Sequence, residues 1–184
     1  DIAKSAFTLA TNFSIAAPEM QKAFDILDTS GKQGMFELKD MAQYLPSLTP
    51  AMAALGYKGT EGLKKLVSLL QTVRLQTGDA SSAATNLQNV FQKMETQKTA
   101  KAFAKMGINL RKEMAQARKD GKDLLDVFVQ LTLKATKGDL SKLPQLFNDL
   151  QFQQGMRAII QGSKALKDFY AGLDDKKVTG AVLK

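Results

Sequence analysis

The acidic side chains are the residues of this sequence that could do catalytic chemistry. Two carboxyl groups can act as acid and base in glycoside hydrolysis, and the acid needs an apolar pocket that raises its pKa. Glu37 is the best candidate because it lies between Phe36 and Leu38. The other acidic residues are scattered, mostly at helix caps and on polar helix faces, for example Asp79, Asp123 and Asp139. We therefore expect Glu37 to lie on a solvated helix surface, and we assign no catalytic residue.

Residues 28–34 lie between two expected helices, where a calcium-binding loop would begin. A loop of twelve residues counted from Asp28 would end at Lys39. Such a loop needs an oxygen ligand at its fifth and twelfth positions and glycine at its sixth. Here these positions hold Lys32, Lys39 and Gln33. Because an ammonium group cannot ligate calcium, we predict no metal site. We expect residues 28–34 to close the preceding helix and form a turn.

Residues 56–62 contain three glycines and are followed by Lys64 and Lys65. A phosphate-binding loop would end in Gly-Lys-Ser or Gly-Lys-Thr and would follow a strand, and neither condition is met. We interpret these glycines as turn residues that separate two helices. The sequence therefore predicts no cofactor site.

Cysteine and histidine are both absent from the 184 residues. The chain thus lacks a thiolate nucleophile, a zinc–thiolate site, the usual base near neutral pH and the commonest ligand of transition metals. These absences exclude serine-triad, zinc-hydrolase and haem chemistry in their usual forms. We expect a chain that is not an enzyme.

The chain is basic, with 26 Lys and Arg against 18 Asp and Glu. All but four of the basic residues are lysines, and they are dispersed along the sequence. Specific recognition of nucleic acid favours arginine, because its guanidinium can bond a base with two donors at once. The lysines are more typical of a solvated surface, so specific nucleic-acid binding is the weaker interpretation.

The elements that position these residues are expected to be helices. Ala, Leu, Lys and Gln are abundant, and all four favour helix. Apolar residues recur at spacings of three and four over residues 60–74 and 79–94, which predicts two helices that pack as a hairpin. The fold class is therefore all-α, with many short amphipathic helices punctuated by Gly and Pro and with no sheet. Pro46 and Pro50 are expected to interrupt the helical pattern.

A helical unit that ends in glycine occurs twice. Residues 54–59 (ALGYKG) precede the hairpin, and residues 105–108 (KMGI) precede a polar stretch and a helix that begins at Asp123. Gly56 suits the left-handed conformation just beyond a helix end. Residues 109–120 are polar, and we expect an exposed loop or a marginal helix there.

The ordered series of these segments resembles the core region of phage tail tape-measure proteins. The matching segments are residues 42–46 (AQYLP), 51–57 (AMAALGY), 61–63 (EGL), 66–70 (LVSLL), 77–78 (TG), 83–87 (AATNL), 104–110 (AKMGINL), 121–124 (GKDL) and 147–170, with Gly155, Arg157 and Ala158 in the middle. The resemblance covers residues 1–174.

The resemblance implies a structural protein of a phage or prophage-derived tail, one that occupies the lumen of the tail tube and sets tail length. It implies location in the virion after assembly in the bacterial cytoplasm. The implied partners are the tail tube protein, tail assembly chaperones and sister chains. It supplies no catalytic residue for this core.

A membrane-active module that assists genome delivery is the alternative. Lysines on the polar faces of amphipathic helices would contact an anionic bilayer. No stretch approaches the roughly 18 apolar residues that a membrane span needs.

We expect a helical domain over residues 1–174, with possible sub-units 1–56, 57–106 and 107–174, and a flexible tail over 175–184. Because the sequence begins with Asp1, we also expect it to be a segment of a longer chain or a processed chain.

Overall fold

A computed structural model of the chain describes residues 2–181. The described residues form α-helices and two 3₁₀ turns and contain no strand, which confirms the all-α prediction. The elements, in chain order, are α1 (Ile2–Asn12), η1 (Ala17–Glu19), α2 (Met20–Gln33), α3 (Leu38–Ala53), α4 (Gly59–Arg74), α5 (Ala80–Lys93), α6 (Gln97–Lys105), α7 (Leu110–Lys119), α8 (Leu124–Thr136), η2 (Leu140–Lys142), α9 (Leu143–Leu146), α10 (Leu150–Gln161), α11 (Ser163–Ala171) and α12 (Asp175–Val178).

Local sequence signals set most helix ends. Asp79 caps α5, where its carboxylate accepts a hydrogen bond from Ser82 N–H at 2.7 Å. Asp123 caps α8 in the same way by accepting from Asp126 N–H at 3.0 Å. Gly56, beyond the end of α3, has a φ of +92°, which confirms the predicted left-handed conformation.

Two predicted breaks are wrong. α2 continues through residues 28–33, which we expected to form a turn, and α3 continues through Pro46 and Pro50. In both helices a side chain from a distant helix donates a hydrogen bond to a backbone carbonyl that lacks its helical donor. In α3 this donor is Ser5 of α1, which bonds the carbonyl of Ala42. The clearer case is Gln71 of α4, whose amide nitrogen donates to the carbonyls of Ser30 and Phe36 at 2.7 and 2.6 Å. The bond to Ser30 thereby replaces the helical donor that this carbonyl in the last turn of α2 lacks.

Residues 110–119 form a regular helix, α7, in the stretch that we expected to be a loop or a marginal helix. Asn109 caps it, and Leu110, Met114 and Ala117 are buried. These three positions recur at spacings of four and three, so they lie on one face, which packs against α8.

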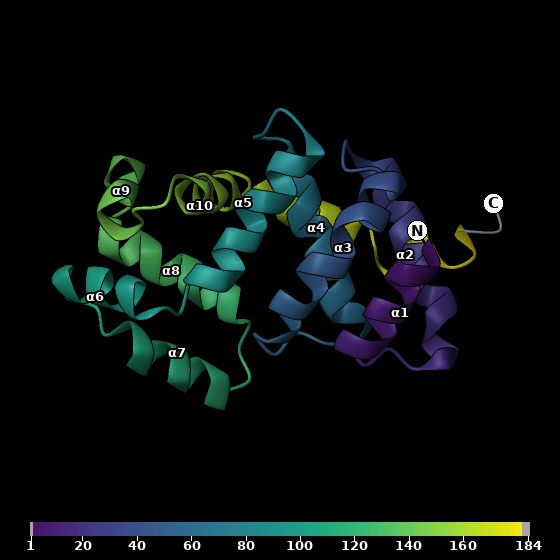
Figure 1. Ribbon diagram of the computed structural model, residues 1–184, viewed down its shortest axis with the longest axis horizontal. Helices are drawn as coiled ribbons and strands as arrows, with labels where there is room; N and C mark the ends of the chain where they lie inside the picture. Colours follow the sequence, from purple (N-terminus) through teal and green to yellow (C-terminus); the bar gives the residue numbers. More distant parts are fainter. Residues whose placement is uncertain (1, 182–184) are drawn as a thin grey trace.

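Helices α1–α3 form one end of the molecule and α6–α9 the other, with α4, α5 and α10 between them (Figure 1). α1 packs on α3, α10 on α5 and α11 on α4. One continuous hydrophobic cluster runs from Leu9 to Val178 and therefore includes residues of all three expected sub-units. Whether those sub-units fold separately stays a prediction.

Residues 175–184, expected to be a flexible tail, begin with α12, which contacts α2. Val178 is buried, and Gly180 N–H donates to Asp25 Oδ2 at 3.1 Å. Residues 182–184 lie outside the described residues, and the flexibility of the tail stays a prediction.

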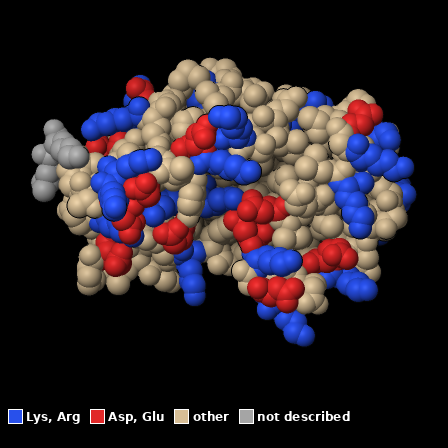
Figure 2. Space-filling model, turned by 180° about the vertical axis from the view of Figure 1, so that it is seen from behind, with Lys and Arg blue, Asp and Glu red and all other residues tan. Residues whose placement is uncertain are grey.

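The basic residues are less evenly spread than the sequence suggested. Residues 97–146, which include α6–α9, carry 11 Lys and Arg and five Asp and Glu, a net charge of +6 out of +8. This end lies at the right of Figure 2, where mostly basic side chains are seen. Among the described helices, none has both the length and the apolar character to cross a membrane.

Candidate functional site

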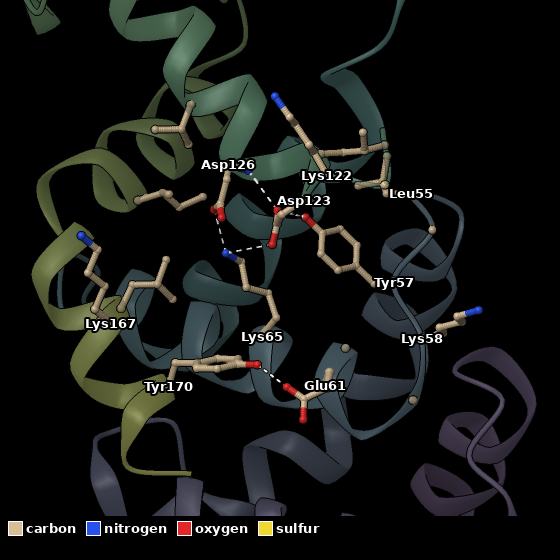
Figure 3. Close-up of a pocket in the computed structure, with 18 of the residues that line it drawn as sticks. Leu55, Tyr57, Lys58, Glu61, Lys65, Lys122, Asp123, Asp126, Lys167 and Tyr170 are labelled. Carbon is tan, nitrogen blue, oxygen red and sulfur yellow. Dashed lines mark hydrogen bonds and ion pairs between the residues drawn. The ribbon is translucent and has the colours of Figure 1, made fainter. Parts of the chain in front are cut away.

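A groove of about 1240 Å³ lies between the two ends of the molecule. The glycine-rich connection between α3 and α4 forms one side, and residues 121–124 at the start of α8 form another (Figure 3). Residues of α10 and α11 complete it. The α3–α4 connection and the turn before α8, which are far apart in the sequence, therefore meet at one place.

Tyr57 joins these two segments. Its hydroxyl donates to Asp123 and accepts a hydrogen bond from Leu125 N–H at 3.0 Å (Figure 3). Burial, together with the negative charge of Asp123, raises the pKa of Tyr57 far above its ordinary value. The phenol therefore stays protonated and serves as a structural link between the α3–α4 connection and α8.

Lys65 of α4 makes a second link to the start of α8. Its ammonium lies 3.2 Å from Asp123 Oδ2 and 2.8 Å from Asp126 Oδ1. The Lys65 side chain is 13% exposed, so solvent screens these ion pairs only in part. Together with Tyr57, it gives both carboxylates at this edge of the groove a partner.

Glu61 and Tyr170 link α4 to α11 on the opposite side. The Tyr170 hydroxyl donates to Glu61, and this bond, helped by Lys64, lowers the pKa of Glu61. Lys64 lies 3.1 Å from Glu61 Oε1 and 3.2 Å from Asp175 Oδ1. Burial disfavours the charged form of Lys64, but its bonds to Glu61 and Asp175 outweigh this and raise its pKa.

The arrangement suits contact better than catalysis. A general acid near neutral pH needs a carboxyl group with a raised pKa, whereas the pKa of Glu61 is lowered. Asp123 and Asp126 are both bonded to Lys65. Within the described residues there is no group of three or more acidic side chains that could hold a metal ion.

The residues that sequence reasoning singled out for possible chemistry lie apart from this groove or serve its structure. Glu37 lies at the start of α3 with a side chain that is 58% exposed, and its N–H donates to Asp40 Oδ2 at 2.9 Å. Lys32 pairs with Asp28 at 2.9 Å within α2. Of the segments considered for ligand binding, residues 56–62 do line the groove.

Sequence reasoning missed the bonding roles of Tyr57 and Tyr170. Asp123 was predicted only as a helix cap, and that prediction is confirmed. One signal was available for Tyr57, because a tyrosine whose ring is buried usually also finds a hydrogen-bond partner for its hydroxyl. Its partner, 66 residues away, carried no such signal.

Comparisons with known proteins indicate a protein family, which the geometry of the groove alone does not. A family model described as "Phage-related minor tail protein" matches residues 1–183. A curated relative described as "Probable tape measure protein", from Burkholderia phage BcepMu, is 35% identical over 122 residues. These residues are 65% of this chain but only 14% of the relative. No solved structure matches the chain.

Proposed function

The chain belongs to the phage-related minor tail protein family, and we propose that it is a segment of a tape measure, the protein that sets the length of a phage tail. As a member of this family it is a structural component of a phage tail. The proposal adds that the chain acts as a ruler for tail length, which we call the ruler role, and that it lies inside the lumen of the tail tube.

The similarity to the relative described as a probable tape measure protein carries this proposal. It covers 65% of the chain at 35% identity, so it concerns most of the fold rather than a short motif. The chain spans 14% of that relative, and the ruler role is proposed for the longer protein of which this segment would be a part.

The short lengths of the helices are compatible with a segment that changes from a packed form to an extended one. The longest, α3 and α4, have 16 residues each, and several have fewer than about 12, below which isolated helices are marginal in water. Tertiary packing therefore stabilises them. Packed, 184 residues have a radius of gyration of about 16 Å and measure roughly 40 Å across. As continuous helix they would extend about 276 Å.

We propose the tail tube protein, tail assembly chaperones and sister chains as partners, with assembly in the bacterial cytoplasm. The role needs no catalytic residue and no cofactor. We propose residues 1–56, 57–106 and 107–174 as the packed units that would separate from one another, because Gly56 and Gly107 lie near their boundaries.

In-frame deletion of residues 1–174 from the parent gene tests the proposal by electron microscopy of the tails. Shorter tails of uniform length are expected. Tails of unchanged length that fail to infect would contradict the ruler role and would favour a delivery module instead.

A further inference from the structure

Two walls of the groove present side chains in the same pattern. α8 contributes Asp126, Val129, Gln130 and Leu133, and α11 contributes Ser163, Leu166, Lys167 and Tyr170. In each helix these are positions i, i+3, i+4 and i+7, the stripe that a helix presents to another helix packed on it. The groove therefore offers two helical ridges with space between them (Figure 3).

The apolar side chains along these ridges are incompletely covered. Val129 and Leu133 of α8, Ile160 of α10 and Leu166 of α11 are all only partly buried. Leu55 and Leu124 form a more deeply buried part of the lining. The volume of about 1240 Å³ exceeds the roughly 300–1,000 Å³ typical of small-molecule sites. A polypeptide ridge fits such a groove better than a small ligand.

The charges at the groove are unevenly matched. Each acidic side chain in its lining, Glu61, Asp123 and Asp126, already bonds a lysine or a tyrosine. Three lysines at its edge, Lys58, Lys122 and Lys167, are exposed and form no ion pair with any residue that the structure describes (Figure 3). They stand on different sides of the groove, so several separate carboxylates are needed to pair with them.

We propose that this groove binds an acidic amphipathic helix of a partner protein. Its apolar face would pack between α8 and α11, and carboxylates beside that face would pair with Lys58, Lys122 and Lys167. This is the helix-in-groove mode of recognition, in which anchors at i, i+3, i+4 and i+7 supply the contact. The inference rests on the groove alone and stands apart from the ruler role.

A designed peptide tests the chemistry directly. The probe is a fluorescein-labelled 18-residue helix with Leu at i, i+3, i+4 and i+7 and Glu on both sides of that stripe. Anisotropy titration with the 184-residue chain is expected to show saturable binding. The same peptide with Lys in place of Glu is expected to bind much more weakly.

Two charge-reversal variants form a matched pair. Lys58→Glu/Lys122→Glu/Lys167→Glu removes the cations at the groove and is expected to weaken binding about tenfold, since exposed ion pairs are individually modest. Lys98→Glu/Lys101→Glu/Lys105→Glu makes the same change in net charge on α6, whose lysines are exposed and do not line the groove. It is expected to change affinity by less than about twofold, because salt screens distant charges. Circular dichroism checks that both variants keep their helices.

Three results would overturn the proposal. One is no saturable binding of the Glu peptide, and another is equal weakening by the two variants, which would indicate only general attraction to a basic surface. The third is dimerisation in sedimentation that the groove variant abolishes, because a second copy would then be the occupant.

Carbodiimide cross-linking in assembled tails tests the source of the helix. It joins lysine amines to nearby carboxylates, so Lys58, Lys122 and Lys167 are expected to link to acidic residues spaced three or four apart in a different polypeptide. Links only to the parent protein itself would contradict a partner helix. Failure here would leave the tail-length result of the deletion unchanged, so the two proposals are separable.

Discussion

The hydroxyl of Ser5 in α1 lies 3.2 Å from the backbone carbonyl oxygen of Ala42 in α3 and donates a hydrogen bond to it. In an uninterrupted helix this carbonyl would accept from the residue four positions later, which here is Pro46 and has no N–H. Ser5 is 2% exposed, so water does not replace the missing donor easily. A residue of one helix thus allows a proline inside another.

Ser5→Ala is expected to destabilise the chain by about 1 to 2 kcal/mol, because it leaves the partly buried carbonyl of Ala42 without a donor. Pro46→Ala restores an N–H that can bond Ala42. In that background Ser5→Ala should cost about 1 kcal/mol less. Urea unfolding of the four chains measures the coupling, and strictly additive costs would contradict the relationship.

Gly155 sets the approach of α10 to α5. A Cβ at this position would lie 2.6 Å from Val90 Cγ2 and 2.8 Å from the carbonyl oxygen of Asn86. Gly155→Ala is therefore expected to destabilise the chain by about 2 kcal/mol, even though alanine favours helix. Gly78→Ala is the control, because a Cβ there meets nothing within 4 Å and Gly78 does not have a positive φ. Equal thermal stability of the two variants would contradict this account.

Tyr57→Phe removes the hydroxyl that bonds Asp123 and Leu125. We expect a loss of about 1 to 2 kcal/mol in the free energy of unfolding, with faster hydrogen exchange at the Leu125 amide. Tyr44→Phe is the matched control, since within the described residues its hydroxyl has no hydrogen bond, and its ring packs on Phe36. A similar loss in both variants would show that the Tyr57 hydroxyl is not a specific link.

The lowered pKa of Asp149 is expected to make part of the stability of the chain sensitive to acid. The bond of Asp149 to Lys93, at 2.6 Å, and its bond from Phe152 N–H lower its pKa below the ordinary 3.8. Because the unfolded chain then binds a proton at a higher pH than the folded chain, this stabilisation is present above about pH 4 and is lost as the pH falls through the folded pKa. Asp149→Asn keeps a helix-capping side chain but removes the charge. Urea unfolding from about pH 5 to about pH 2 should show a smaller loss of stability in this variant, and an unchanged slope would contradict the prediction.

Local features of the fold were predictable from the sequence, and contacts between distant residues were not. The cap at Asp79 and the left-handed Gly56 depend on residues next to them, so they are visible in the sequence. The helix through Pro46 depends on Ser5, and the end of α2 depends on Gln71, 41 residues from Ser30. The groove was hidden for the same reason. The glycines of the α3–α4 connection were recognised as separating two helices, but the pairing of Tyr57 with Asp123 joins residues that no local pattern relates.

The change in tail length per residue of this segment tests the ruler role most directly. Three strains would be compared by electron microscopy. One has residues 1–174 deleted, one has the natural copy, and one has a tandem duplication of these residues. If the segment is a ruler in extended helical form, each residue should change the length by about 1.5 Å in both directions. Tails whose length is the same in all three strains would contradict the ruler role.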